Sequence, residues 1–387
     1  MMKAFAIQVW IGDGISSTMM RLRVIEGPAS RPRLASCRPS SSPRPGRRLH
    51  SPTPSSSSPK TPPSCRVRAS AGAEASTRTL GASGLTVSTV GLGTIGWGDE
   101  SYGFNSRYRA VDLRETFEAA VEGGITFFDT AEVYGYKQHE YQSSSEHLLG
   151  DFAGEASEPV IIGSKVFTIP WTNLIVKGTS PRLGSEALVD ALKKSVERVG
   201  RPVDLWSIHF PFPTFKNSVL MDALKEASDL GLTTAVGVSN FSKDQMIEAS
   251  EICSRLGIKL SANQVKFSLL DRSNEKNGLL SAAEALDVAV VAYSPLAGGK
   301  LTSSGAAKNP KDDKLAELLK LMEFVGVVNG GKSISQVALN WLVRKGALPI
   351  PSARSAEQAR EHAGAMGWSL DDNEMSLLEE KLEYLGW

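Results

Sequence analysis

From Leu80 onward, short runs of apolar residues rich in Val, Ile and Phe alternate with longer stretches whose apolar positions recur every three or four residues. The short runs predict strands and the longer stretches predict amphipathic helices. The predicted strands are 86–93, 125–129, 160–166, 203–210, 233–239, 261–267, 288–294 and 347–352. The predicted helices are 111–122, 145–152, 185–199, 219–229, 243–256, 279–286, 315–328, 334–344 and 356–363.

Several of the predicted strands are apolar throughout, which is typical of parallel strands buried on both faces. Many of the predicted helices end at a glycine just before the next strand, where a left-handed residue stops a helix. Eight strand–helix units in succession predict a (β/α)8 TIM barrel. A doubly wound open sheet is the alternative, because alternation alone does not separate an open sheet from a closed one.

A barrel of this kind carries its functional residues at the C-terminal ends of its strands. Six chemically versatile residues follow or end predicted strands here, which places them together at one end of the barrel. They are Asp129, Lys165, His209, Asn240, Gln264 and Tyr293. The sequence therefore predicts a site at the C-terminal face.

Four residues of this face have the chemistry that carbonyl reduction needs. When a hydride adds to the carbonyl carbon, the oxygen becomes negative and must receive a proton. Tyr134 can supply that proton, although an unperturbed tyrosine has a pKa near 10. The ammonium of Lys165 is expected to lower the pKa of Tyr134, and Asp129 to keep that lysine charged. His209 is expected to donate a hydrogen bond to the carbonyl oxygen.

Each of these four residues also has a purely structural interpretation. Asp129 could cap a helix, since DTAE resembles a cap and an acidic first turn. Lys165 could lie on the surface, His209 in the apolar core, and Tyr134 in a loop. The functional interpretation is favoured because all four fall at one end of one predicted barrel.

Two nucleotide-binding motifs occur in the wrong structural context. The GxGxxG sequence at 91–96 follows a strand, but the residues after it do not predict the helix that would meet a pyrophosphate. The Walker A pattern at 326–333 follows a predicted helix instead of a strand. There, Ser333 and Gln336 predict a capping box for the next helix.

The N-terminal 73 residues differ from the rest of the chain in charge. They carry twelve Lys and Arg against two Asp and Glu, whereas the remainder carries 31 against 40. From Pro28 to Ala73 the chain has nine Lys and Arg, twelve Ser, ten Pro and no acidic residue. This composition predicts a disordered transit peptide over 1–73, with plastid import favoured over mitochondrial import, and a folded domain over 74–387.

The chain resembles the aldo-keto reductase superfamily, in particular its plant chloroplastic branch. Seven segments carry the resemblance in order along residues 78–380: FFDTAEVYG, GSK, IHFP, AVGVSNF, NQVKFSLLDR, AYSPLAGGKL and PIPSARSAEQARE. The resemblance implies a (β/α)8 barrel that binds NADPH at the C-terminal face of its strands. It also implies that Asp129, Tyr134, Lys165 and His209 form the catalytic tetrad.

The resemblance further implies which residues hold NADPH. Ser239, Asn240 and Gln264 would hold the nicotinamide amide, and Tyr293 would stack on the nicotinamide ring. Residues that would line the pyrophosphate path are Ser294, Pro295, Leu296 and Ala297. Residues that would hold the adenosine end are Ser352, Arg354, Gln358 and Glu361. Gly93 and Thr94 would pass close to the cofactor. Because guanidinium binds phosphate well, Arg354 would favour NADPH over NADH.

Three segments depart from the family pattern. Glu361 is followed by His362 where relatives often have Asn. The segment after Leu301 is short and lacks the usual GKY lysine, for which Lys300, Lys308 or Lys311 could substitute. The segment 168–183 is longer than usual and carries the apolar insert NLIVKG.

Taken together, these features predict an NADPH-dependent reductase that converts aldehydes and ketones to alcohols in the chloroplast stroma. One alternative is an NADPH-binding, redox-sensing module with little turnover, and pyridoxal reduction is a substrate variant of the first function. The aromatic residues Trp97, Tyr102, Phe104, Trp171 and Phe212 could form a substrate wall or simply pack in the scaffold. The expected partner is a small carbonyl compound, and no metal site, nucleic-acid site or membrane span is predicted.

Overall fold

The computed structural model describes residues 76–387 except 170–171, 173–180, 213–214 and 310. The predicted domain 1–73 lies outside the described residues. Eight parallel strands, β3 to β10, pair in sequence order. Their bounds are Leu92–Gly93, Phe127–Asp129, Ile161–Val166, Val203–Ile208, Thr233–Ser239, Leu260–Lys266, Ala289–Tyr293 and Ala347–Pro349.

The first and last strands of this sheet meet and close it into a barrel. Gly93 forms a parallel bridge with Ser352, and the backbone N–H of Gly91 donates to the carbonyl of Pro349 at 2.9 Å. The glycine at position 93 fits this contact, because a Cβ there would lie 3.1 Å from the carbonyl oxygen of Ile350. The predicted TIM barrel is confirmed, and the open doubly wound alternative is excluded.

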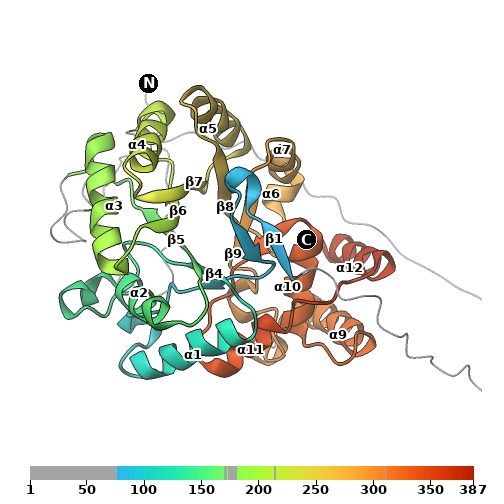
Figure 1. Ribbon diagram of the computed structural model, residues 1–387. Coiled ribbons are helices and arrows are strands. Elements are labelled where there is room, and N and C mark those ends of the chain that lie inside the picture. The colour runs from blue at the N-terminus through green and yellow to red at the C-terminus, as the bar shows by residue number, and fades with distance from the viewer. Residues whose placement is uncertain (1–75, 170–171, 173–180, 213–214, 310) are drawn as a thin grey trace, which may run out of the picture. The chain divides into compact units, whose positions relative to one another are not determined.

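Helices surround the strands, as Figure 1 shows in a view through the barrel. The longer helices are α1 (Ala110–Glu122), α2 (Ser145–Glu155), α3 (Ser185–Val199), α4 (Asn217–Asp229), α5 (Lys243–Arg255), α9 (Asp313–Val328), α10 (Ile334–Arg344) and α12 (Asp372–Leu385). The shorter helices are α6 (Ser273–Lys276), α7 (Leu279–Ala285), α8 (Gly305–Lys308) and α11 (Ala356–Ala363). Within the described ranges, no helix is long and apolar enough to cross a membrane.

The prediction of a single strand over residues 86–93 is wrong. Its first part forms β2 (Thr86–Ser88), which pairs antiparallel with β1 (Thr77–Thr79) in a hairpin outside the barrel sheet. The turn of this hairpin packs against the N-terminal ends of the strands, where Ala82 N–H donates to the carbonyl of Asp287. Only the last part of the expected strand, β3, belongs to the barrel.

The Walker A pattern is confirmed as a helix–turn–helix connection. Gly326 lies inside α9, and Ser333 caps α10 through a capping box with Gln336. A Cβ on Gly326 would lie 2.0 Å from the carbonyl oxygen of Lys332. Close packing of the turn against the helix therefore explains this glycine.

This packing gives opposite expectations for two helical glycines. Gly326→Ala should lower the free energy of unfolding by about 1–3 kcal/mol, because overpacking outweighs the helix propensity of Ala. Gly154→Ala, in α2, should be neutral or stabilising by up to about 1 kcal/mol, since no atom lies within 4 Å of its Cβ position. Urea unfolding of both variants measures the difference, and equal stability would contradict the packing argument.

Candidate active site

The two-residue period of the strands turns three of the four tetrad residues, Asp129, Lys165 and His209, into the barrel. Successive side chains of a strand point to opposite faces. In β4, Phe127 belongs to the apolar cluster inside the barrel and Phe128 to the cluster outside it. Asp129 therefore faces inward again. The same parity carries Lys165 inward after Gly163, and His209 inward after Leu205 and Ser207.

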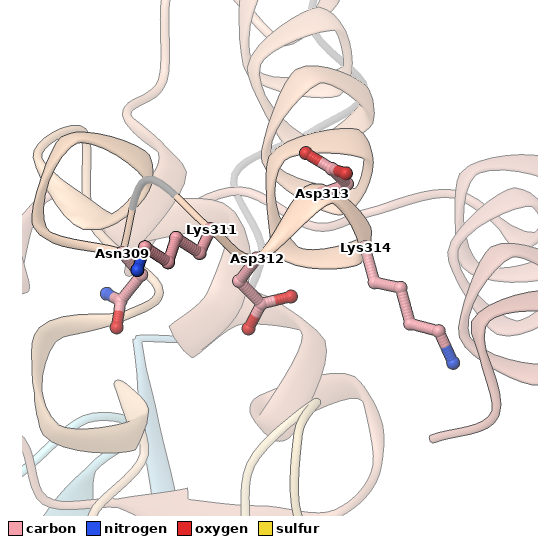
Figure 2. A pocket seen from close by; sticks show the side chains of 5 residues that line it. All are labelled: Asn309, Lys311, Asp312, Asp313 and Lys314. Atoms are coloured by element: carbon pink, nitrogen blue, oxygen red, sulfur yellow. The ribbon is translucent and has the colours of Figure 1, made fainter.

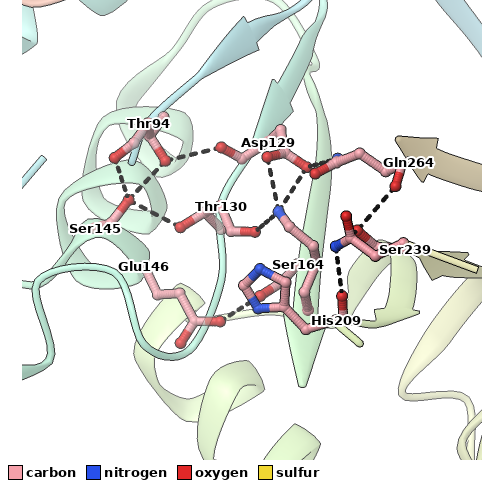
Figure 3. A network of polar contacts seen from close by, with 11 residues as sticks. Thr94, Asp129, Thr130, Ser145, Glu146, Ser164, His209, Ser239 and Gln264 are labelled. Carbon is pink, nitrogen blue, oxygen red and sulfur yellow. Dashed lines mark hydrogen bonds and ion pairs between the residues drawn. The ribbon is translucent and has the colours of Figure 1, made fainter. Parts of the chain in front are cut away.

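Asp129, which is labelled in Figure 3, forms a buried ion pair with Lys165 at the mouth of the barrel. The side-chain nitrogen of Lys165 lies 2.9 and 2.7 Å from the two carboxylate oxygens and 2.6 Å from the carbonyl oxygen of Thr130. Lys165 is 2% exposed and Asp129 is 4% exposed. A lysine ammonium has three N–H donors, so these contacts use all of them. The interpretation of Lys165 as a surface residue is excluded.

Tyr134 lies beside this ion pair but is not hydrogen-bonded to Lys165 in the contacts of the described residues. The Lys165 nitrogen is 5.0 Å from the centre of the tyrosine ring. Burial raises the pKa of Tyr134 well above its usual value, and the Asp129 carboxylate raises it further. The prediction from the sequence, a lowered pKa of Tyr134, is therefore wrong. That prediction considered only the charge of Lys165 and left out the burial of Tyr134 and the charge of Asp129.

His209 lies among aromatic rings next to Tyr134. Its ring stacks on Phe210 with centroids 4.9 Å apart and meets the edge of Phe167 at 5.4 Å and of Tyr134 at 5.9 Å. Burial lowers the pKa of His209 well below its usual value, and the charge of Lys165 lowers it further. Its Nδ1 is buried without a hydrogen-bond partner among the described residues. The imidazole is therefore neutral at neutral pH.

Three residues predicted to hold the nicotinamide amide lie at the ends of β7 and β8. Gln264 Nε2 donates to Asp129 Oδ1 at 2.7 Å, which links this group to the ion pair. Ser239 Oγ donates to the carbonyl of Gln264 at 3.0 Å. Asn240 Nδ2 donates to Ser239 Oγ and to the carbonyl of His209, both at 3.0 Å. Tyr293, at the end of β9, donates to Asn240 Oδ1 at 2.9 Å.

The backbone is unusual at three of the predicted cofactor positions. Asn240, Ser294 and Ala297 have φ of 61°, 52° and 49°, in the left-handed region that residues other than glycine rarely adopt. Such conformations cluster at ligand-binding sites, where the surrounding structure imposes them. Pro295 and Leu296 lie between the last two of these residues. This segment is shaped by its surroundings, as expected of a wall for a ligand.

The predicted adenosine residues lie in the segment before α11 and within that helix. Arg354 donates to the carbonyl of Tyr102 at 3.0 Å, and Gln358 Oε1 accepts from the Arg354 N–H at 2.8 Å. Ser352 is exposed. Glu361 instead accepts from Ser333 Oγ at 2.8 Å, which places its carboxylate at the start of α10.

His362 and Thr94 are both buried. The Nε2 of His362 lies 3.3 Å from the carbonyl oxygen of Ser352, so His362 contacts the segment that was predicted to hold adenosine. Thr94 is fully buried, and its hydroxyl donates to the carbonyl of Asp129 at 2.9 Å. Because the whole residue is buried, Thr94 has no exposed atom that could contact a cofactor in this structure.

The segment after Leu301 folds into the short helix α8 and then leads into α9. Lys300, Lys308 and Lys311, the suggested substitutes for the missing lysine, are all exposed. A surface hollow of about 730 Å³ lies at this turn and is shown in Figure 2. It is lined by Asn309, Lys311, Asp312, Asp313 and Lys314. None of these is a predicted cofactor residue, so the hollow is not the tetrad site.

The family pattern of the aldo/keto reductase family matches residues 89–383. The chain belongs to this family. Among its relatives, the chloroplastic pyridoxal reductase of Arabidopsis thaliana is 31% identical over 315 residues, which cover 76% of this chain and 83% of the relative. The 6-dehydroglucose reductase of Novosphingobium aromaticivorans is 31% identical over 293 residues, covering 74% and 88%.

Solved structures agree with the barrel of this aldo/keto reductase. A thermostable aldo-keto reductase crystallised with the inhibitor epalrestat is 29% identical, with a TM-score of 0.64 over 79% of this chain and 99% of that one. The glycerol dehydrogenase of Gluconobacter oxydans has a TM-score of 0.65 over 78% and 93% at 24% identity, which supports the fold alone. The family membership makes the chain an oxidoreductase.

The sequence did not predict two further buried ion pairs near the tetrad of this aldo/keto reductase. Arg182, fully buried, donates to Glu132 at 2.8 Å, while the other carboxylate oxygen of Glu132 accepts from Phe167 N–H at 2.6 Å. Glu146 accepts from Arg198 at 2.6 Å and from Ser164 Oγ at 2.5 Å. The only hint in the sequence was the position of the two glutamates within segments that are otherwise apolar or small. Their arginine partners lie about 50 residues further along the chain, so no local pattern links them.

Arg182 belongs to the long segment 168–183, of which only residues 168–169, 172 and 181–183 are described. Two of its nitrogens, Nε and Nη1, have no hydrogen-bond partner among the described residues. The ion pair with Glu132 attaches the end of the segment to the loop that carries Tyr134. The apolar insert and Trp171 lie outside the described residues.

Two of the suggested wall aromatics instead pack in the scaffold. Trp97 is fully buried and its indole N–H donates to the carbonyl of Ala353 at 2.9 Å. Phe104 is also buried and meets Tyr108 with ring centroids 6.2 Å apart. Tyr102 and Phe212 are only partly buried and remain candidates for the wall.

The lowered pKa values of the histidines allow a prediction of how the free energy of unfolding depends on pH. The pKa of each described histidine is lowered mainly by burial, to about 4 for His139; the others are His147, His209 and His362. Below about pH 6.5 the unfolded chain therefore binds more protons than the folded one, so the free energy of unfolding falls. Carboxylates with a lowered pKa, such as Glu146, add to this loss only at lower pH.

The expected result is a melting temperature that falls steadily between pH 7 and pH 5 in the approximate window set by these pKa values. His139→Gln should flatten part of that fall, because a neutral amide replaces a group that resists protonation. Differential scanning calorimetry at matched ionic strength measures both. A melting temperature that stays constant between pH 7 and pH 5 would contradict the lowered pKa values of these histidines.

Proposed function

We propose that this aldo/keto reductase is an NADPH-dependent reductase of aldehydes and ketones. The observation that carries the proposal is the convergence of four residues on one barrel mouth: the buried Asp129–Lys165 pair, Tyr134 beside it, and a neutral His209 across from it. A proton donor, a fixed positive charge and a hydrogen-bond donor are what the oxygen of a carbonyl needs as it becomes negative.

The residues at the ends of β7, β8 and β9 fit a nicotinamide cofactor. Amide and hydroxyl groups of Ser239, Asn240 and Gln264 match a carboxamide, and the half-buried ring of Tyr293 offers an aromatic face. The left-handed residues Asn240 and Ser294 support a shaped wall there. NADPH, when bound, would supply the hydride that adds to the carbonyl carbon.

Tyr134 would donate the proton to the carbonyl oxygen. Its raised pKa keeps it protonated throughout the neutral range, and an alkoxide is a much stronger base than a phenolate. The nearby positive charge of Lys165 would stabilise the phenolate that remains. Asp129 holds that charge, since it opposes the desolvation that lowers the pKa of Lys165.

His209 would orient the carbonyl oxygen. A neutral imidazole donates one N–H and carries no charge that would compete with Tyr134 as an acid. The rings of Phe167 and Phe210 enclose it and limit access of water. A carbonyl compound held between His209 and Tyr134 would have its oxygen within reach of both donors.

The choice of NADPH over NADH is supported by Arg354 at the start of α11. A guanidinium binds the 2′-phosphate of NADPH well, and a helix N-terminus favours an anion. The side chain also reaches the carbonyl of Tyr102, so phosphate would share or replace this contact.

Two other functions are supported by particular observations. Pyridoxal reduction is a substrate variant supported by the plant relative named pyridoxal reductase. A low-turnover, NADPH-binding redox sensor is supported by the short segment after Leu301, and by the engagement of all three Lys165 donors away from Tyr134.

We also propose that residues 1–73 are a transit peptide and that 74–387 are the mature reductase of the chloroplast stroma. The support is the basic, Ser- and Pro-rich composition of that segment and the chloroplastic relative from Arabidopsis. A fusion of residues 1–73 to a fluorescent protein, imaged in plant cells, tests this directly.

The decisive experiment compares wild type with Tyr134→Phe. Purified residues 74–387 should consume NADPH with 4-nitrobenzaldehyde or pyridoxal, and should bind NADPH more tightly than NADH by fluorescence quenching. Tyr134→Phe should lose about 10²–10⁴-fold in kcat, the usual contribution of a general acid, and still bind NADPH. Tyr141→Phe, the same change at an exposed tyrosine, is the control and should behave like wild type.

The outcomes separate the alternatives. A wild type that binds NADPH but reduces no compound in a broad carbonyl panel would favour the sensor function. Turnover of pyridoxal far above that of other aldehydes would favour the pyridoxal variant. A wild type that binds neither NADPH nor NADH would contradict both the reductase and the sensor.

A further inference from the structure

Helix α2 begins directly behind the loop that carries Tyr134, and its first residue is Ser145. The backbone N–H of Ser145 donates to the carbonyl oxygen of Tyr134 at 3.1 Å. Ser145 is fully buried. The start of the helix therefore holds the backbone of the proposed proton donor.

The hydroxyl of Ser145 connects two more residues next to the ion pair, as Figure 3 shows. Its Oγ lies 2.6 Å from Thr94 Oγ1, 2.8 Å from Thr130 Oγ1 and 3.1 Å from the carbonyl oxygen of Thr94. All three residues are fully buried. No water replaces these contacts easily if the hydroxyl is removed, because the site is closed to solvent.

The direction of the hydrogen bonds follows from the one proton that each hydroxyl has. Thr94 donates its proton to the carbonyl of Asp129. Ser145 must then direct its one proton to Thr94, shared between Oγ1 and the carbonyl oxygen, and Thr130 must donate to Ser145. A directed chain thus runs from Thr130 through Ser145 and Thr94 to the backbone of Asp129.

Both ends of this chain belong to residues that fix Lys165. The carbonyl oxygen of Thr130 accepts one of the three ammonium protons at 2.6 Å, and the Asp129 carboxylate accepts the other two. The positions of Thr130 and Asp129 together therefore set where the lysine nitrogen lies relative to the ring of Tyr134, 5.0 Å away.

We propose that Ser145 is a positioning residue for carbonyl reduction, whose hydroxyl holds Lys165 through Thr130 and Thr94 and thereby steadies the loop that its backbone N–H joins to Tyr134. The proposal rests on the proposed reductase function. Ser145 touches none of the reacting atoms. Removal of the Ser145 hydroxyl should let Lys165 and Tyr134 shift relative to each other. Such misplacement costs up to about 100-fold in rate.

The chain offers a matched control at the preceding residue. Ser144 is also fully buried, and its hydroxyl bonds His147 Nδ1 at 2.7 Å, outside the chain that reaches Lys165. Ser144→Ala and Ser145→Ala thus each remove one buried hydroxyl from the start of the same helix. Only the second change removes a connection to the tetrad.

The first measurement is steady-state reduction of 4-nitrobenzaldehyde by residues 74–387. Ser145→Ala should lower kcat by about 10- to 100-fold while the Kd for NADPH stays near that of wild type. Ser144→Ala should keep kcat within about two-fold of wild type. Equal kcat values for the two variants would overturn the proposal.

Thr130→Val tests the same connection from the other side. This change keeps the side-chain shape and the backbone carbonyl but removes the hydroxyl that donates to Ser145. The double variant, Thr130→Val with Ser145→Ala, should be little slower than either single variant. Each single change already breaks the same hydrogen bond between Thr130 and Ser145. Independent, multiplicative losses would overturn the proposal. Should Ser145→Ala fail to fold, the kcat of Thr130→Val decides the question alone.

Hydrogen exchange gives a readout that does not depend on turnover. The amides of Thr130, Glu132 and Tyr134 are all bonded to nearby carbonyls in the wild type. Peptides that cover them should exchange faster in Ser145→Ala than in Ser144→Ala. A wild type that turns over no aldehyde would overturn the proposed function, and unchanged exchange would separately overturn the role of Ser145 in holding the loop.

Discussion

The buried ion pair between Asp129 and Lys165 is the interaction on which the site depends. Burying two charges costs several kcal/mol for each ion, and only close contacts with further hydrogen bonds offset that cost. Here the carboxylate accepts two bonds from the lysine and one from Gln264, and the third ammonium proton goes to Thr130. The lysine is therefore held in one place, and Tyr134 and His209 are arranged around a fixed charge.

The barrel supplies the rigidity that such a pair requires. The strands that carry Asp129 and Lys165, β4 and β5, are neighbours in register, and inward parity brings both side chains to the same mouth. Behind them lie the buried pairs Glu132–Arg182 and Glu146–Arg198, from the Tyr134 loop and from α2. The polar surroundings of the tetrad are thus fixed from outside the barrel as well as from inside it.

Much of this arrangement could be predicted from the sequence, because it depends on local periodicity. Alternation along ITFFD, VIIGSK and VDLWSIH places Asp129, Lys165 and His209 at strand ends, and the eight units give the barrel. The hairpin of β1 and β2 was missed, since residues 86–93 alternate as one strand would and the change of direction depends on packing under the barrel. Helix α12 was also missed, and the pairings of Arg182 and Arg198 join residues too distant in sequence for any pattern to show. The raised pKa of Tyr134 follows from burial, which periodicity does not measure.

We propose that the ion pair makes Tyr134 an effective proton donor to a carbonyl. The most direct test removes the pair as a unit with Asp129→Asn and Lys165→Met together, which leaves no unpaired buried charge behind. Stopped-flow mixing of the NADPH-loaded variant with an aldehyde would then be compared with wild type. We expect that the double variant still binds NADPH and that its aldehyde-dependent oxidation of NADPH is slower than that of the wild type by orders of magnitude. Oxidation at the rate of the wild type would show that the ion pair is not needed for proton donation by Tyr134.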